Sequence, residues 1–140
     1  MPYLVGIVLA LGAALFARVT GFDRDRSFYP TVLVIIALLY GLFAVIGGST
    51  SALVAEGGPM AVFVLLAVFG HRYSTWLVVV GLAGHGGFDF FHPHFITNPG
   101  VPPFWPQFCM AYDVTAAIFL GWLLLRAGRE APEAPNHSHT

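Results

Sequence analysis

The sequence predicts an all-α integral membrane protein, built as a bundle of about five transmembrane helices. Of its 140 residues, 57% are hydrophobic and only 9% are charged, whereas about a quarter of residues are charged in an ordinary soluble domain. Five apolar segments approach the roughly 20 residues that a helix needs to cross a bilayer. Helices are favoured over strands because lipid cannot satisfy the unpaired backbone groups of an open sheet. Runs such as 31–40 also lack the alternating pattern of a membrane β-barrel.

The predicted helices follow one another within residues 1–129, which we take as one membrane domain. They lie at about residues 3–17, within 27–55, and at 59–70, 74–92 and 108–125. Arg18 can extend its side chain from the short first helix to the interface, and Pro30 suits the first turn of the second. Residues 51–56 either extend the third helix or form a lead-in on its outer side. Since no Lys or Arg precedes the first apolar segment, we expect a retained helix rather than a signal peptide.

The distribution of arginine predicts the orientation of the bundle. Arginine collects on the cytoplasmic side of a membrane, in short loops and near the helix ends. With five helices, all the arginines fall on one side, at Arg18, Arg24, Arg26, Arg72, Arg126 and Arg129. The sequence therefore predicts an N-out, C-in topology, in which the second and fourth connections face outward.

The composition excludes nucleic acid as a partner and predicts a lipid environment. Lys is absent and the net charge is −1, so no basic stripe is available to bind a nucleic acid. The single cysteine, Cys109, excludes an intramolecular disulfide. Residues 130–140 are polar and contain proline, which predicts a disordered cytoplasmic tail with solvated His137 and His139. The expected surroundings are the lipid bilayer, with self-association or another membrane protein as further partners.

A group of polar residues interrupts the fourth and fifth predicted helices. His85, Asp89 and His92 are four and three residues apart, a spacing that places them on one face of a helix. An acid near the middle of a membrane costs about 2.5–3.5 kcal/mol, so this face should turn toward protein or a water-filled cavity. Asp113 should lie about 9 Å below the outer start of the fifth helix, level with His85 and Asp89. We therefore expect these residues to meet in the outer half of the bundle.

The same residue types are ligands that Zn²⁺ prefers. A catalytic zinc site uses three protein ligands drawn from His, Asp, Glu or Cys and keeps one open position. His85 and His92 are two helical turns apart, so we expect one helical pair to contribute rather than both. The predicted metal ligands are His85, Asp89 and Asp113. Supplementary ligands could come from His92, His94 and Cys109. Asp89 could instead orient the His85 ring as a hydrogen-bond acceptor.

Other interpretations of these residues are open at this point. An Asp and a His four residues apart can hydrogen-bond to each other and to Asp113 or Tyr112, and so hold two helices together without a metal. Glu56 fits an interfacial residue at the start of a helix, where the helix dipole favours an acid. Cys109 fits an inert buried thiol. The glycines within 84–87 are expected to permit close approach between helices.

The stretch from His85 to Asp113 carries a distinctive pattern. It contains His-Gly-x-x-Asp-x-x-His, then Asn-Pro-Gly-Val-Pro, Trp-Pro-x-Phe-Cys and Tyr-Asp. This pattern resembles the signature of a family of small, uncharacterised bacterial polytopic membrane proteins, which implies a bacterial inner (plasma) membrane. The pair His85 and Asp89 also faintly resembles the His-x-x-x-Asp motif of intramembrane zinc hydrolases related to alkaline ceramidases. In that comparison Asp113 takes the place of histidines on another helix, and five predicted helices take the place of seven.

Three classes of function follow as hypotheses, and whether the protein is an enzyme is left undecided. In the first, His85, Asp89 and Asp113 hold Zn²⁺ in an intramembrane hydrolase that acts on a lipid or amphiphile from the outer leaflet. His92 or Glu56 would then be the catalytic groups that transfer protons. In the second, a non-enzymatic subunit or scaffold docks through the polar face of the fourth helix. In the third, a small carrier is linked to protons or ions, for which intramembrane acids and histidines are typical.

Overall fold

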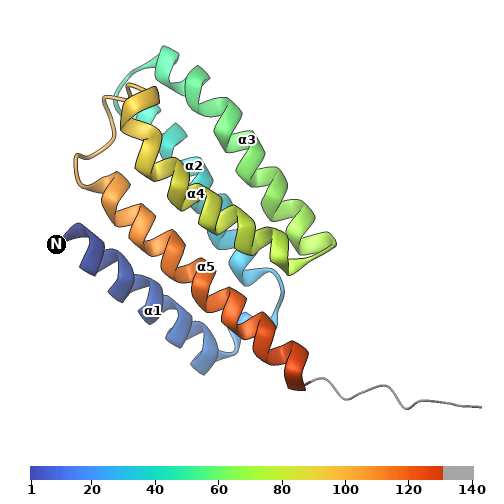
Figure 1. The fold of residues 1–140 in the computed structure, drawn as a ribbon. Coiled ribbons are helices and arrows are strands. Elements are labelled where there is room, and N and C mark those ends of the chain that lie inside the picture. Colours follow the sequence, from blue (N-terminus) through green and yellow to red (C-terminus); the bar gives the residue numbers. More distant parts are fainter. Residues whose placement is uncertain (131–140) are drawn as a thin grey trace, which may run out of the picture.

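The computed structural model describes residues 1–130, and within them the protein is all helical. Its elements are α1 (Pro2–Thr20), the 3₁₀ turn η1 (Phe22–Arg24), α2 (Phe28–Ile46), α3 (Thr50–Arg72), α4 (Thr75–Phe95) and α5 (Trp105–Glu130). Figure 1 shows the five α-helices packed lengthwise as one bundle. The predicted all-α class and the helix count are confirmed. The predicted tail at 130–140, with His137 and His139, lies outside the described residues except for Glu130, which ends α5.

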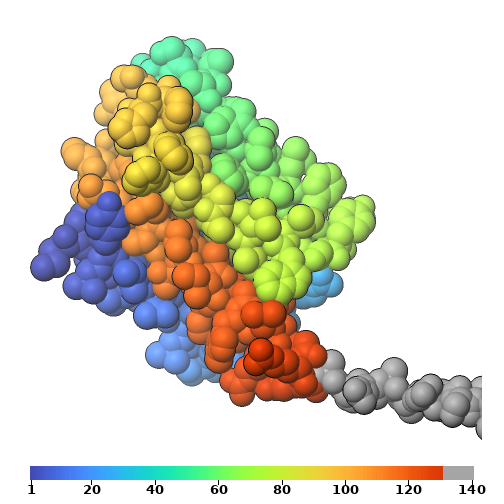
Figure 2. All heavy atoms as spheres, in the orientation of Figure 1, coloured from blue at the N-terminus to red at the C-terminus, as the bar shows by residue number. Residues whose placement is uncertain are grey.

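Helix α4 lies between the other helices and carries the polar stripe. It packs against α2, α3 and α5, whereas α1 packs against α5 and η1. In the space-filling view, α1, α5, α4 and α3 follow one another across one face of the molecule (Figure 2). Helices α1, α2, α3 and α5 are each long and apolar enough to cross a membrane. Helix α4, with 21 residues, has the length to cross, and its neighbours enclose His85, Asp89 and His92.

Two helices continue through proline residues that we expected near their ends. Helix α3 begins at Thr50. The hydroxyl of its N-cap residue, Ser49, accepts a hydrogen bond from the Ala52 backbone N–H at 3.1 Å. Residues 51–56 therefore extend the third helix, and Pro59 lies inside it. Helix α4 likewise runs past its predicted end, with Pro93 in its last turn. These extra turns bring polar residues of the outer end into the bundle.

Gly86, one of the glycines expected to permit close approach between helices, sets the distance between α4 and α5. A Cβ added to Gly86 would lie 2.8 Å from Val114 Cγ2 on α5, closer than two carbons can pack. At Gly84 the nearest atom would be a ring carbon of Phe63 at 3.6 Å, an ordinary contact, and at Gly87 nothing lies within 4 Å. The expectation of close approach is confirmed for Gly86 and wrong for Gly84 and Gly87. The absent Gly86 side chain lets the neighbouring His85 reach α5.

The arginines gather at the end of the bundle where α1, α3 and α5 finish, and all of them are exposed. Two of them make ion pairs. Arg18 pairs at 3.4 Å with Asp23, whose side chain is 4% exposed, and Arg126 pairs at 2.9 Å with the exposed Glu130. The prediction that the arginines share one end is confirmed. The N-out, C-in direction relative to a membrane stays a prediction, and on that basis we call this the inner end.

Candidate metal centre

Five ionisable side chains are buried together in the half of the bundle away from the arginines. Glu56, His85, Asp89, His92 and Asp113 are each exposed by 3% or less. They come from three helices, with α3 supplying one, α4 three and α5 one. Ionisable groups are almost never fully buried unless they are paired, so the partners of each group decide what the site can do.

Two facing helical turns build the first group, hereafter called the four-residue cluster. His85 and Asp89 lie one turn apart on α4, and Cys109 and Asp113 lie one turn apart on α5. His85 Nδ1 lies 2.6 Å from Asp113 Oδ2 and 3.4 Å from Asp89 Oδ2. Cys109 Sγ lies 3.7 Å from Asp113 Oδ2. One ligand atom from each residue lies within 4.8 Å of the other three, so this cluster could hold a metal ion.

The Glu56–His92 pair forms a second group, nearer the outer end. His92 Nε2 lies 2.5 Å from Glu56 Oε1. The Asn98 side-chain amide donates to the same carboxylate oxygen at 3.0 Å and to the Tyr40 backbone carbonyl at 3.0 Å. Asn98 belongs to the loop between α4 and α5, so its amide ties that loop to both α2 and α3. The Asn98 amide thereby holds the loop over the pair.

Tyr40 of α2 connects the two groups. Its hydroxyl donates to Asp89 Oδ1 at 2.6 Å, and its ring stacks on His92 with the ring centroids 4.0 Å apart. Our sequence reasoning missed both Tyr40 and Asn98. A signal existed for each residue. For Tyr40, it is that a buried tyrosine hydroxyl needs a polar partner. For Asn98, it is that the Asn-Pro-Gly segment of the signature had no role in the predicted site.

The two groups contain more carboxylates than cations. With both histidines protonated, three carboxylates would still face two positive charges, and the arginines lie at the opposite end. Three carboxylate oxygens, Glu56 Oε2, Asp89 Oδ2 and Asp113 Oδ1, are buried without a hydrogen-bond partner. Asp89 Oδ2 lies 3.4 Å from His85 Nδ1, but the hydrogen bond of that nitrogen is the shorter contact with Asp113 Oδ2. Since buried charges without a counter-charge cost several kcal/mol, a divalent cation or an additional proton would relieve the site.

The predicted ligands come together, and the two histidines of the α4 stripe separate. His85, Asp89 and Asp113 share the four-residue cluster, as the helical spacing and the depth argument predicted. His92 lies outside it and pairs with Glu56. Cys109, predicted either as a supplementary ligand or as an inert thiol, is part of the cluster. That these residues bind a metal, and that His92 and Glu56 act in catalysis, stay predictions.

The interpretation of Glu56 as an interfacial residue at a helix start is wrong. Helix α3 begins at Thr50, so Glu56 lies in its second turn, and its side chain is 0% exposed. The reason is the extension of α3 through Pro59, which carries Glu56 inward until it faces His92. A buried glutamate is acceptable there because His92 and Asn98 both bind its Oε1 atom.

Two hollows reach the four-residue cluster from outside. One of about 210 Å³ lies among α1, α4 and α5, and its lining includes Asp89 together with the polar Tyr3, His94 and Gln107. His94, which we considered as a supplementary ligand, is exposed on this rim and lies outside the cluster. Because Asp89 is part of the lining, this hollow is a route by which water or an ion could approach the cluster.

The second hollow is apolar and opens between α2 and α5. It measures about 250 Å³, and its lining includes Ile36, Leu39, Trp105, Phe108 and the thiol of the cluster, Cys109. The indole N–H of Trp105 is buried without an acceptor. The apolar lining of this hollow suits a hydrocarbon chain.

Fold and site together define a helical protein with membrane-spanning character and a buried His/Asp/Cys cluster that could hold a metal ion. Comparisons with protein family models, with curated proteins and with solved structures find no match for this chain. The two family resemblances seen in the sequence therefore stay predictions. Function has to be inferred from the geometry of the site.

Proposed function

We propose that this protein is a membrane-embedded zinc hydrolase that cleaves a lipid or another amphiphile entering from the outer leaflet. The observation that carries the proposal is the four-residue cluster, whose ligand atoms lie within 4.8 Å of one another and whose Asp89 and Asp113 each keep one unpaired oxygen. Intramembrane acids are costly, and they usually mark functional sites. A bound cation would balance the excess of carboxylates.

The distances within the cluster fit zinc after one hydrogen bond opens. Tetrahedral bonds of about 2.0–2.3 Å place ligand atoms roughly 3.3–3.8 Å apart. His85 Nδ1 is 3.4 Å from Asp89 Oδ2, which is within this range, but only 2.6 Å from Asp113 Oδ2. The latter pair would separate by about 1 Å once an ion replaced the proton between them. We assign His85, Asp89 and Asp113 as ligands, with Cys109 beside the remaining position.

The Glu56–His92 pair is suited to proton transfer next to this centre. Hydrolysis takes one proton from the attacking water and gives one to the leaving group, which requires positioned acid and base groups. His92 lies under the outer loop, and a hollow of about 250 Å³ there is lined by His92 and Asn98. The pair therefore has a route to the outer surface on one side, and on the other side it is linked to Asp89 through Tyr40.

The two hollows indicate the class of substrate. The apolar hollow between α2 and α5 would accept an acyl chain, and the unpaired N–H of Trp105 would donate to an ester or amide carbonyl. The hollow at Asp89 would admit water. A bound Zn²⁺ makes water nucleophilic near neutral pH. The water oxygen would add to the acyl carbon while the Glu56–His92 pair takes the proton of the water. The acyl C–O or C–N bond would then break as the pair returns a proton to the leaving alcohol or amine.

The geometry of α4 gives little support to the alternative in which the protein is a non-enzymatic docking subunit. His85, Asp89 and His92, which define the polar face of α4, are exposed by 3% or less within the chain itself. A partner could contact them only if α4 parted from its neighbours. A hydrolytic site needs no such separation.

Elemental analysis of the detergent-purified full chain tests the metal. We expect about one zinc per chain, the content of a mononuclear site, in the wild type and in His94→Ala, whose side chain lies outside the cluster. His85→Ala and Asp89→Ala should each lose most of this zinc. Asp89→Asn, nearly identical in shape, covers the case in which an alanine variant fails to fold. Wild type without stoichiometric metal, or unchanged metal in the folded cluster variants, would exclude the proposal.

Hydrolysis of long-chain acyl ester and amide probes in mixed micelles tests the reaction. His85→Ala should abolish cleavage, and Glu56→Gln should keep the zinc while slowing cleavage by about 10²–10⁴-fold, the usual contribution of acid–base catalysis. His94→Ala should remain active. A zinc-loaded wild type that cleaves neither probe class would favour the ion carrier over the hydrolase.

A further inference from the structure

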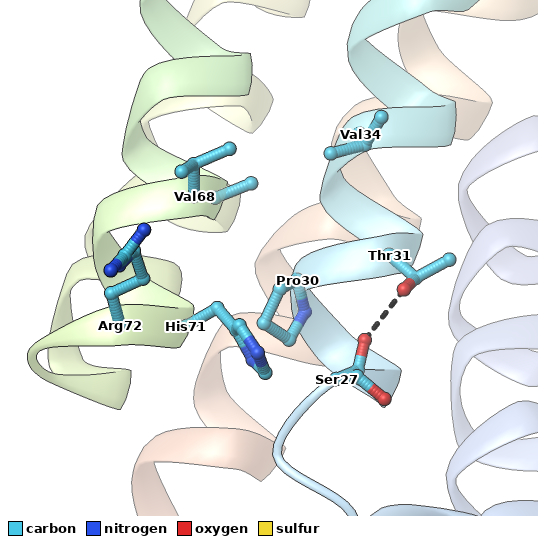
Figure 3. A pocket seen from close by; sticks show the side chains of 8 residues that line it. Ser27, Pro30, Thr31, Val34, Val68, His71 and Arg72 are labelled. Carbon is cyan, nitrogen blue, oxygen red and sulfur yellow. Dashed lines mark hydrogen bonds between the residues drawn. The ribbon is translucent and has the colours of Figure 1, made fainter.

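A hollow larger than the two beside the candidate metal centre lies at the inner end of the bundle. It measures about 510 Å³, within the range of ligand-binding pockets, and lies between the first turns of α2 and the last turns of α3. Figure 3 shows Pro30 and Val34 on α2 facing Val68 on α3. These side chains make the hollow apolar along most of its depth.

The mouth of this hollow is cationic. Arg72 is exposed at the end of α3 and makes no ion pair with any residue of the described chain. His71 Nδ1 lies 3.4 Å from the Arg26 backbone carbonyl, to which its N–H can donate. This contact holds the imidazole between the two helices, beside Ser27 (Figure 3). No acidic residue lines the hollow.

Asp25, the acidic residue closest in sequence to Ser27, makes its hydrogen bond within the loop between α1 and α2. Asp25 Oδ1 accepts a hydrogen bond from the Ser27 backbone N–H at 3.1 Å, and this bond holds the pKa of the Asp25 carboxyl below its ordinary value. Asp25 belongs to the lining of a different hollow, on the side of α5. Asp25 also interacts electrostatically with His71, so Arg72 is the cationic group at this mouth that has no acidic partner among the described residues.

We propose that this hollow binds an anionic phospholipid, with the phosphate at Arg72 and one acyl chain between Val34 and Val68. The arginines of this end mark the level of the membrane surface, so a lipid headgroup and the cationic mouth lie at the same depth. A guanidinium group binds phosphate oxygens in a two-point arrangement. Basic pockets between membrane helices bind anionic headgroups on the cytoplasmic side. The apolar walls favour a lipid over free phosphate, and the proposal does not depend on the metal centre.

Retention of lipid through purification tests the proposal. The full chain is equilibrated in mixed micelles of phosphatidylglycerol and phosphatidylcholine with identical acyl chains, and bound lipid is counted by native mass spectrometry. We expect phosphatidylglycerol to be retained about fivefold over phosphatidylcholine, the preference that one basic residue near an anionic surface supplies. Arg72→Gln should remove this preference. Arg129→Gln, another exposed arginine of the inner end, should keep it.

Two further experiments distinguish binding in this hollow from general electrostatic attraction of lipid and from binding of free phosphate. Val68→Trp fills the hollow without changing charge, and it should lower retention of both lipids. Inorganic phosphate at millimolar concentration should not displace phosphatidylglycerol. Equal losses in Arg72→Gln and Arg129→Gln, full retention in Val68→Trp, or displacement by inorganic phosphate would each overturn the proposal.

Discussion

The two ends of this bundle handle charge in opposite ways. At the inner end every arginine is exposed, and the ion pair between Arg126 and Glu130 joins side chains that are 54% and 65% exposed. At the outer half, three acids and two histidines are exposed by 3% or less and bind one another directly. The inner arginines are stabilised by solvent, and the buried outer groups depend on their protein partners.

This difference distinguishes exposed arginines, which orient a membrane protein, from buried charged groups, which form its candidate site. Exposed arginines at helix ends cost little and are exchangeable, since each keeps its own hydration. A buried acid is retained only where its partners offset its desolvation, and the outer half meets this condition incompletely, with three unpaired carboxylate oxygens. We therefore expect substitutions to have large effects at the outer half and small effects at the inner end.

The largest effect should come from removing one member of the buried Glu56–His92 pair. Glu56→Leu should lower the free energy of unfolding by about 3–5 kcal/mol, because His92 then keeps a buried polar ring without its partner. The double variant Glu56→Leu/His92→Leu should cost clearly less than the sum of the single variants, since two apolar groups leave nothing unpaired. Unfolding titrations with a denaturing detergent measure this cycle. Additive effects would show that the pair is not coupled.

An intermediate effect is expected from Tyr40→Phe. The change removes the hydroxyl that donates to Asp89 at 2.6 Å, and a hydrogen bond to a charged group contributes about 1.5–3 kcal/mol. Tyr29→Phe is the matched control, because the Tyr29 hydroxyl is buried without any partner. The control should be neutral or stabilising in the same titration. Equal losses in both variants would mean that Asp89 does not need this donor.

The smallest effect should follow Glu130→Gln at the inner end. The Arg126–Glu130 pair is exposed and lies one helical turn apart, and such pairs contribute about 0.3–0.5 kcal/mol. The midpoint of detergent unfolding should hardly move, and 0.5 M salt should leave the variant and the wild type alike. A loss comparable to that of Tyr40→Phe would break the contrast between the two ends.

The helices and the part of the site formed by His85, Asp89 and Asp113 could be predicted from the sequence. The physical reasons for this also explain why the rest of the site could not. Apolar length identifies spans, and the i, i+4 spacing with an antiparallel connection was enough to bring His85 and Asp89 to Asp113. The start of α3 could not be derived, because Glu56 before Pro59 has the pattern of a helix start unless His92 is known to face it. Tyr40 is 49 residues from Asp89 in the chain, and the packing of α2 on α4 leaves no periodic signal.

The polar stripe of α4 has a consequence for how the chain is made. Helix α4 is absent from the set of helices apolar enough to cross a membrane by themselves, and its two acid partners on the other helices, Glu56 and Asp113, emerge from the ribosome before and after it. During synthesis, Glu56 is already present to receive His92, but His85 and Asp89 have no partner on α5 until residue 113 has been made. We expect α4 to wait at the translocon until α5 arrives, so that the two helices enter the lipid as a pair.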